Sequence, residues 1–190
     1  MICLEGMNMM EIKCCVITGH RPTRFKFKYD ENNNGCKRIK KRIRDQLIFL
    51  YEQGFRQFWV GGALGVDMWA GEILLRLKEQ PEYNEIQLMI ALPFEGHDAN
   101  WEERSRRRMS FLIRHSNETI IVGQKDAPPA MNYRKRNEYM VDRADLLLAI
   151  YDNDRSIRSG TGMTVHYAEK KGLPITLIHP DTGVITTARQ

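Results

Sequence analysis

A short turn rich in glycine and threonine places hydrogen-bond donors at the start of a predicted helix. Gly160, Thr161, Gly162 and Thr164 follow an apolar run over 146–150 and open a helical pattern. Free backbone N–H groups and the positive end of a helix dipole attract anions such as phosphate. Glycine lets a ligand approach the backbone closely, and the threonine hydroxyls add donors. The turn is therefore a candidate phosphate site, and an ordinary capped turn between a strand and a helix is the alternative.

A second glycine turn precedes another predicted helix. Gly61, Gly62 and Gly65 resemble a phosphate-cradling loop, but their spacing differs from the dinucleotide-binding fingerprint, and no Lys-Ser/Thr pair completes a P-loop. Asp67 stands at the helix start, where a carboxylate can stabilise the helix dipole or accept a hydrogen bond from a ribose hydroxyl. Both roles stay open. Glu72, further along the same helix, is a second carboxylate that can reach the pocket.

The first predicted strand also ends in residues that suit phosphate binding. Thr18, Gly19, His20 and Arg21 combine a hydroxyl, a flexible backbone, an imidazole and a guanidinium. Arg21 can bind a phosphate through two parallel hydrogen bonds, and His20 can donate a hydrogen bond or titrate. Pairing of Arg21 with a surface carboxylate is the alternative.

Four further residues complete the set of ligand-binding candidates. Arg136 and Asn137 can project toward a ligand from a predicted helix. Pro93 follows the third predicted strand, and Trp101 lies on the apolar side of a later helix, from which its ring can stack on a ligand ring. The histidines are scattered and suggest no metal triad, so we expect no metal site.

These candidates need elements that bring them together. Apolar runs of strand length alternate with helical patterns. The predicted strands cover 13–18, 57–60, 86–92, 119–122, 146–151 and 175–178. The predicted helices cover 36–52, 66 to a stop before Pro81, 100–116, 133–143 and 162–171, with loops over 23–35 and 123–132 and a short tail after 178. This alternation predicts an α/β fold with a mostly parallel sheet and helices on both faces, which binds ligands where the strand-terminal turns meet.

Length and composition narrow the class of protein. At 190 residues the chain is expected to form one domain, with residues 1–11 a loose leader or an ambiguous start site. Its 29 basic and 24 acidic residues give a net charge of +5, which suits polyanions without demonstrating nucleic-acid binding. Cys3, Cys14, Cys15 and Cys36 lack the paired spacing of a zinc site and favour a reduced, cytoplasmic setting. We expect no membrane segment, because no apolar run is long enough.

Taken together, these motifs resemble the SLOG superfamily, which unites DprA/Smf proteins with LOG-type proteins, and in particular its YpsA-like branch. The matching segments lie in order along nearly the whole chain. They are Thr18-Gly19-His20-Arg21-Pro22, Gly61-Gly62-Ala63-Leu64-Gly65-Val66-Asp67 with Trp69 and Glu72, Pro93-Phe94 with Trp101, Arg136-Asn137 with Met140-Val141-Asp142, and Gly160-Thr161 with Thr164. The resemblance implies a Rossmann-like domain that binds a nucleotide or a nucleotide-derived ligand, such as AMP or ADP-ribose.

The favoured function is that of a nucleotide-ligand binding protein, acting as a sensor, carrier or sequestering protein rather than as an efficient enzyme. In this hypothesis the glycine and threonine turns hold phosphate, and Arg21 and Arg136 add positive charge. The oligomeric state stays open, a homo-oligomer included.

Two neighbouring families supply the alternatives. LOG enzymes hydrolyse the N-glycosidic bond of nucleoside monophosphates and pair an Arg with a Glu just after a Pro-Gly-Gly-x-Gly-Thr turn. Here Arg136 matches the Arg, but the first carboxylate after Thr161 is Glu169, so a nucleotide N-glycosidase or phosphoribohydrolase would need Glu72 or Asp67 instead. The second alternative is a single-stranded DNA-binding protein of DprA type, which the positive charge permits.

Overall fold

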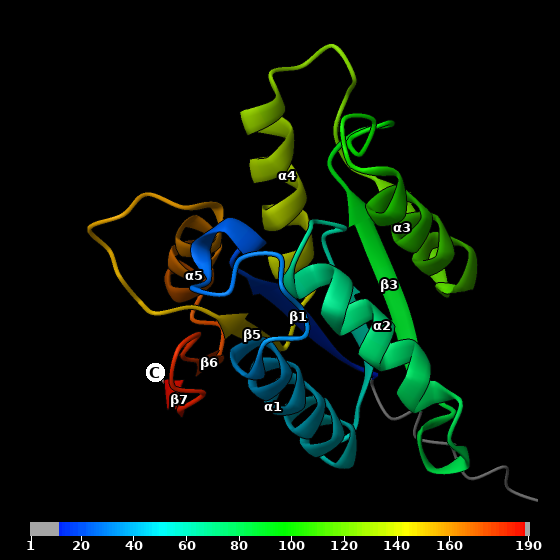
Figure 1. Cartoon of the computed structure of the whole chain (residues 1–190), viewed down its shortest axis with the longest axis vertical. Coiled ribbons are helices and arrows are strands. Elements are labelled where there is room, and N and C mark those ends of the chain that lie inside the picture. Colours follow the sequence, from blue (N-terminus) through cyan, green and yellow to red (C-terminus); the bar gives the residue numbers. More distant parts are fainter. Residues whose placement is uncertain (1–11, 189–190) are drawn as a thin grey trace, which may run out of the picture.

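In the described part of the chain, residues 12–188 of a computed structural model, seven strands form one sheet in the order β4-β3-β2-β1-β5-β6-β7 (Figure 1). The strands are β1 (Lys13–Gly19), β2 (Phe55–Val60), β3 (Gln87–Leu92), β4 (Glu118–Ile121), β5 (Leu146–Ile150), β6 (Ile175–Ile178) and β7 (Ile185–Ala188). Neighbouring strands are parallel except β6 and β7, which pair antiparallel. The predicted α/β fold with a mostly parallel sheet is therefore confirmed.

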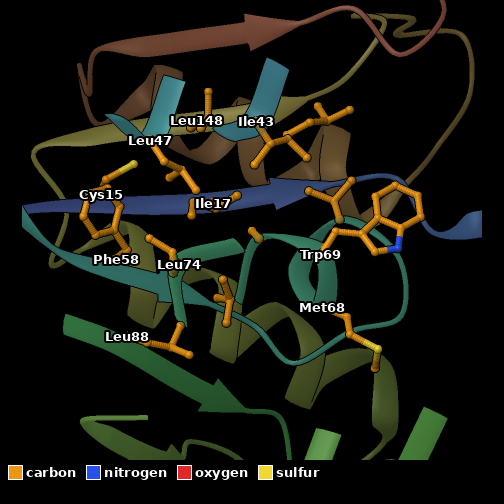
Figure 2. Packing of buried hydrophobic residues seen from close by; sticks show 14 of the residues in the cluster. Cys15, Ile17, Ile43, Leu47, Phe58, Met68, Trp69, Leu74, Leu88 and Leu148 are labelled. Atoms are coloured by element: carbon orange, nitrogen blue, oxygen red, sulfur yellow. The ribbon is translucent and has the colours of Figure 1, made fainter. Parts of the chain in front are cut away.

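Helices cover both faces of the sheet. They are α1 (Asn34–Glu52), α2 (Val66–Lys78), α3 (Glu103–His115), α4 (Pro129–Val141) and α5 (Gly160–Lys170), with short 3-10 turns η1 (Pro22–Arg24) and η2 (Pro81–Tyr83). Because successive strand side chains point to opposite faces, Cys15 and Ile17 of β1 belong to one core and Val16 to the other. The first core packs against α1, α2 and α3 (Figure 2), and the second against α4 and α5.

The order of the strands reverses between β1 and β5. From β1 the chain proceeds through β2 and β3 to β4 at one edge, and from β5 it proceeds through β6 to β7 at the other. β1 and β5 are neighbours, and Gly19 pairs with Ile150 at their carboxyl ends. At such a switch point the two connections leave in opposite directions, so a crevice opens beyond the strand ends.

The predicted loop over 23–35 is more ordered than the sequence indicated. It contains η1, and α1 begins at Asn34 rather than at residue 36. The side chain of Asn33 accepts the backbone N–H of Gly35 at 2.8 Å, which caps the helix. The polar residues that suggested a loop therefore include a helix start.

Other boundaries also differ, among them the start of α3, which is Glu103 rather than residue 100, so Trp101 precedes this helix instead of lying on it. Helix α4 begins at Pro129 inside the predicted loop over 123–132, since proline is well suited to the first turn of a helix. Helix α5 begins at Gly160, where the side chain of Ser159 caps it. The predicted tail contains β7, which is reached through a tight turn at Gly183, where φ is 70°.

Several composition-based expectations concern the whole chain. Within residues 12–188, no helix is both long and apolar enough to cross a membrane. The cysteines in this range, Cys14, Cys15 and Cys36, carry free thiols, and the range holds no group of three possible metal ligands. Cys3 and the expected leader over 1–11 lie outside the described residues.

A network of charges, here called the Glu31 clasp, joins the loop before α1 to the helices on the first face. The Glu31 carboxylate accepts hydrogen bonds from Arg108 at 2.7 Å, Trp69 Nε1 at 3.0 Å and Lys40 at 2.5 Å. Arg108 also donates to both carboxylate oxygens of Glu72, at 2.6 and 2.9 Å. Although burial acts to raise it, the hydrogen bonds from Arg108, Lys40 and Trp69 lower the pKa of Glu31 from 4.5 to about 2.

Replacing Glu31 with Gln should destabilise the fold at neutral pH and have a smaller effect in acid. The depressed pKa means that the Glu31 charge stabilises the protein above about pH 4.5, and that this contribution is lost as the pH falls toward 2. We expect Glu31→Gln to lower the free energy of unfolding by about 1–3 kcal/mol at pH 7 in urea denaturation. The difference from the unchanged protein should shrink at pH 3.

Glu103→Gln is the matched control, because it removes one carboxylate charge that is exposed, in the first turn of α3, where it pairs with Arg107. Such a pair contributes about 0–1 kcal/mol. Equal losses for the two variants, or a loss for Glu31→Gln that does not depend on pH, would contradict the assigned role of the clasp.

Candidate anion-binding site

A cavity of about 830 Å³ lies at the carboxyl ends of β1 and β5. Its walls come from the residues that follow β1, from α4 and from the start of α5, so segments remote in sequence meet at one edge of the sheet. The charged side chains of its lining are Arg21, Arg24, Arg134, Arg136, Arg158 and Asp67. Because positive side chains outnumber the single carboxylate, the cavity suits an anionic ligand.

An arginine and an aspartate lie buried side by side in the cavity wall. Arg136 is 5% exposed and Asp67 is 6% exposed, and Arg136 Nη1 lies 3.4 Å from Asp67 Oδ2. The same oxygen accepts the backbone N–H groups of Gly61 at 2.9 Å and Ala63 at 3.3 Å. Asp67 therefore fixes the turn after β2 and holds Arg136 at the same time.

Arg136 keeps donors that the protein does not satisfy. Its Nε is buried without a hydrogen-bond partner, and Nη2 forms no hydrogen bond to any residue of the described range. Burial lowers the pKa of Arg136 and raises that of Asp67, while the opposite charge of each partner acts against its shift. An anion beside Arg136 would offset part of this desolvation cost.

Arg21 and Arg136 share the aromatic ring of Tyr133. The guanidinium carbon of Arg21 lies 5.3 Å from the ring centroid, and that of Arg136 lies 5.8 Å from it. Within residues 12–188, Arg21 forms no ion pair with a carboxylate. The alternative that Arg21 pairs with a surface carboxylate is therefore not observed. Two guanidinium groups near one ring raise the positive potential of this part of the cavity, which favours a phosphate or a carboxylate there.

The first turn of α5 forms another part of the wall. Ser159 caps the helix by accepting the N–H of Gly162 at 3.0 Å. The N–H groups of Gly160 and Thr161 have no partner within the described chain, as is usual for the first residues of a helix. The side chain of Thr161 is 7% exposed, and its hydroxyl also lacks a partner there. These donors and the helix dipole form an anion-receiving edge, beside which Arg158 lines the cavity.

His20 connects the end of β1 to the loop after β5. It is 2% exposed, and its Nε2 lies 3.4 Å from Asp152, whose other oxygen lies 3.8 Å from Arg24. Burial lowers the pKa of His20, although Asp152 acts to raise it. The lowered pKa favours the neutral imidazole, which can donate or accept a hydrogen bond.

Many of the predicted ligand-binding residues meet in the cavity. The ones that line it are Thr18, Gly19, His20, Arg21, Asp67, Arg136, Asn137, Gly160 and Thr161. The amide of Asn137 forms no hydrogen bond within residues 12–188, so it is available to a ligand. The convergence of the strand-terminal turns is thus observed, and the contact of each residue with a ligand stays a prediction.

Other predicted residues are not part of the cavity lining. They are Gly61, Gly62, Gly65, Pro93, Trp101, Gly162 and Thr164. His97 Nε2 lies 2.9 Å from the carbonyl oxygen of Gly62, and the Thr164 hydroxyl donates to the carbonyl of Gly160 at 2.9 Å. Trp101 packs edge-on against His97, with ring centroids 5.3 Å apart. The groups of Gly62, Thr164 and Trp101 are thus engaged in contacts within the protein.

Of the two candidate catalytic carboxylates, only Asp67 lines the cavity. Glu72 lies five positions further along α2, which turns its side chain about 140° around the helix. There it is held by Arg108 in the Glu31 clasp. Nothing in the sequence near Glu72 indicated this partner, because Arg108 comes from α3.

The cavity also includes residues that the sequence did not single out. Tyr133 lies one turn before Arg136 and Asn137 on α4, and this helical spacing was a usable signal. Arg158 and Met163 adjoin the turn at the start of α5. Their place depends on the path of the loop over 151–159, for which the sequence has no periodic pattern.

The fold and this site define a Rossmann-like α/β protein with a cationic cavity at its switch point. The model of the YspA SLOG family (YpsA) matches residues 15–182. The chain belongs to this family, which confirms the resemblance drawn from the motifs.

Relatives with similar sequences come from bacilli. A UPF0398 protein of Halalkalibacterium halodurans is 29% identical over 144 residues, which cover 76% of this chain and 75% of that protein. A UPF0398 protein of Bacillus cereus strain G9842 is 28% identical over 162 residues, 85% of each chain.

A solved structure shares the fold. DNA processing protein A from Helicobacter pylori, described for its single-stranded DNA binding mode, aligns with a TM-score of 0.57 and 18% identity over 87% of this chain. This chain spans 64% of the length of that protein. At this level of identity the likeness shows the fold alone.

Gly61 has no room for a side chain. A Cβ atom there would lie 1.2 Å from Nη1 and 2.4 Å from Cζ of Arg136, so alanine must displace the guanidinium and leave Asp67 buried without its cation. We expect Gly61→Ala to lower the free energy of unfolding by about 1–3 kcal/mol in urea denaturation. Gly160→Ala is the control, because nothing lies within 4 Å of the added atom, and it should leave stability unchanged or slightly higher. Unchanged stability of Gly61→Ala would argue against the buried pair.

Proposed function

We propose that the cavity binds a nucleotide or a nucleotide-derived ligand whose phosphate lies between Arg136, Arg21 and the start of α5. The observation that carries the proposal is Arg136, which is 5% exposed and still keeps donors without a partner in the described chain. A buried guanidinium of this kind costs free energy, and a phosphate is the partner that matches its geometry. The free N–H groups of α5 supply further donors to the same anion.

The polar groups beside the arginines suit the rest of a nucleotide. Asp67 Oδ2 is occupied by the internal contacts, whereas Oδ1 accepts no hydrogen bond within residues 12–188. A carboxylate repels a phosphate and accepts hydrogen bonds from hydroxyls, so Asp67 is assigned to the ribose. Asn137, which can donate and accept, is assigned to the ribose or the base.

A binding role, as a sensor, carrier or sequestering protein, agrees better with the site than efficient catalysis. Cleavage of a glycosidic bond needs a carboxylate beside the departing bond. The first turn of α5 carries none, and Glu72 is held by Arg108 outside the cavity. The free thiols of the described cysteines fit a reduced, cytoplasmic setting, where nucleotides are abundant.

Arg21→Gln and Arg136→Gln should each weaken the binding of AMP about tenfold or more, since each variant loses a charge-assisted contact. The measurement is a thermal-shift titration with AMP, ADP, ADP-ribose, NAD and cyclic nucleotides. For the unchanged protein, a ligand at 100 times its Kd adds about 2.7 kcal/mol of stability. Lys135→Gln removes a positive charge from the same helix outside the cavity lining and should bind as the unchanged protein does.

Two outcomes of this panel would count against nucleotide binding. One is the absence of a shift with every nucleotide while a single-stranded oligonucleotide is retained at about 150 mM salt. That result would favour the DprA-type alternative, to which the fold likeness with DNA processing protein A points. The other is an equal shift for Arg21→Gln, Arg136→Gln and the unchanged protein, which would place binding elsewhere.

The LOG-type glycosidase is the second candidate, and Asp67 is the observation that favours it. It lines the cavity, and burial raises its pKa, which suits a general acid. Because Arg136 and two backbone N–H groups hold the carboxylate, we expect AMP to stay intact during prolonged incubation, with chromatography detecting no free adenine. If adenine is released and Asp67→Asn abolishes the release, the glycosidase activity would replace the binding role.

A further inference from the structure

Two methionines form an exposed apolar part of the cavity wall. Met131 of α4 is 43% exposed and Met163 of α5 is 39% exposed, and both line the cavity that the arginines line. Single exposed apolar side chains are common on protein surfaces. Two from separate helices in one concave and otherwise cationic site form the apolar surface that a ligand pocket offers to the apolar part of its ligand.

The methionines are set apart from the proposed phosphate position. On α4, Met131 precedes Arg136 by five residues, which corresponds to about 7.5 Å along the helix axis. Arg136 is 5% exposed and Met131 is 43% exposed, so along α4 the wall runs from a buried charge to an exposed apolar side chain. In a nucleotide, the ribose separates the charged phosphate from the flat base in a similar way.

Methionine side chains suit contact with a flat ring. The thioether is unbranched, adapts its shape and makes favourable contacts with aromatic rings. Trp101, which the sequence indicated for ring stacking, packs against His97 and does not line the cavity, so another residue must take that role.

We propose that Met131 and Met163 form the ring-binding wall of the cavity, so that its ligand is a nucleotide with its base in place rather than a sugar phosphate or free phosphate. This inference rests on the proposed nucleotide function and specifies the ligand class of the same site. A thioether forms dispersion contacts with any base and reads little of its hydrogen-bonding edge, so the wall accepts more than one base. Asn137, which also lines the cavity, is the nearby group that can select among bases.

The test compares AMP with ribose 5-phosphate, which lacks the ring, in calorimetric titrations of the full chain. AMP should bind at least about tenfold more tightly than ribose 5-phosphate. Met131→Gln and Met163→Gln should each weaken AMP binding about two- to tenfold, the effect of losing one sulfur–aromatic contact, and should leave ribose 5-phosphate unchanged. Met131→Leu and Met163→Leu, which keep an apolar side chain, should retain most of the AMP affinity.

The control is Ile121→Gln, which removes a side chain of similar exposure, 50%, from β4 outside the cavity and should not alter either affinity. Equal affinities for AMP and ribose 5-phosphate, or equal losses for both ligands in the methionine variants, would overturn the ring-binding wall while leaving phosphate binding intact. Absence of binding by both ligands, together with the absence of a thermal shift with every nucleotide of the panel, would instead remove the proposed function and this inference together.

Discussion

The contact between Arg136 and Asp67 is the constraint on which the rest of the site depends. The guanidinium fits there only because Gly61 has no side chain, and the aspartate oxygen that faces it also accepts the backbone N–H groups of Gly61 and Ala63. One carboxylate thus fixes the turn after β2, the start of α2 and the middle of α4. Because both charges are buried and only partly compensated, the arrangement favours an anion that completes the hydrogen bonds of the guanidinium.

The parallel sheet supplies the place for this contact. At the switch point between β1 and β5 the connections separate, and residues from both sides of the sheet reach the same edge. The approach is close, since a Cβ atom on Gly19 would lie 2.5 Å from the side chain of Val66 at the start of α2. On the first face, the Glu31 clasp holds α2 against α3 through Arg108 and keeps Glu72 outside the cavity. Packing and electrostatics therefore determine that the cavity contains the carboxylate of Asp67 and not that of Glu72.

The polar groups of the cavity underlie the proposal that it holds a phosphate rather than cleaving a glycosidic bond. Family membership gives the SLOG fold, and residues 15–182 match its model. The described helix α5 carries no carboxylate before Glu169, and the Thr164 hydroxyl donates to the carbonyl of Gly160. The donors that remain free, on Arg136 and Thr161, are groups that stabilise negative charge on a bound ligand.

The sequence by itself determined the alternation of strands and helices, the family, and the turns that meet beyond β1 and β5. These features follow from local signals, namely apolar periodicity and glycine at the ends of strands. Only the tertiary structure decided that Arg136 lies buried over Gly61 and that Glu72 belongs to an ionic clasp. It also decided that Met131 lines the cavity and Trp101 does not. The physical reason is that the partner of a charge and the burial of a side chain depend on residues far away in the chain. No pattern within one helix or turn carries that information.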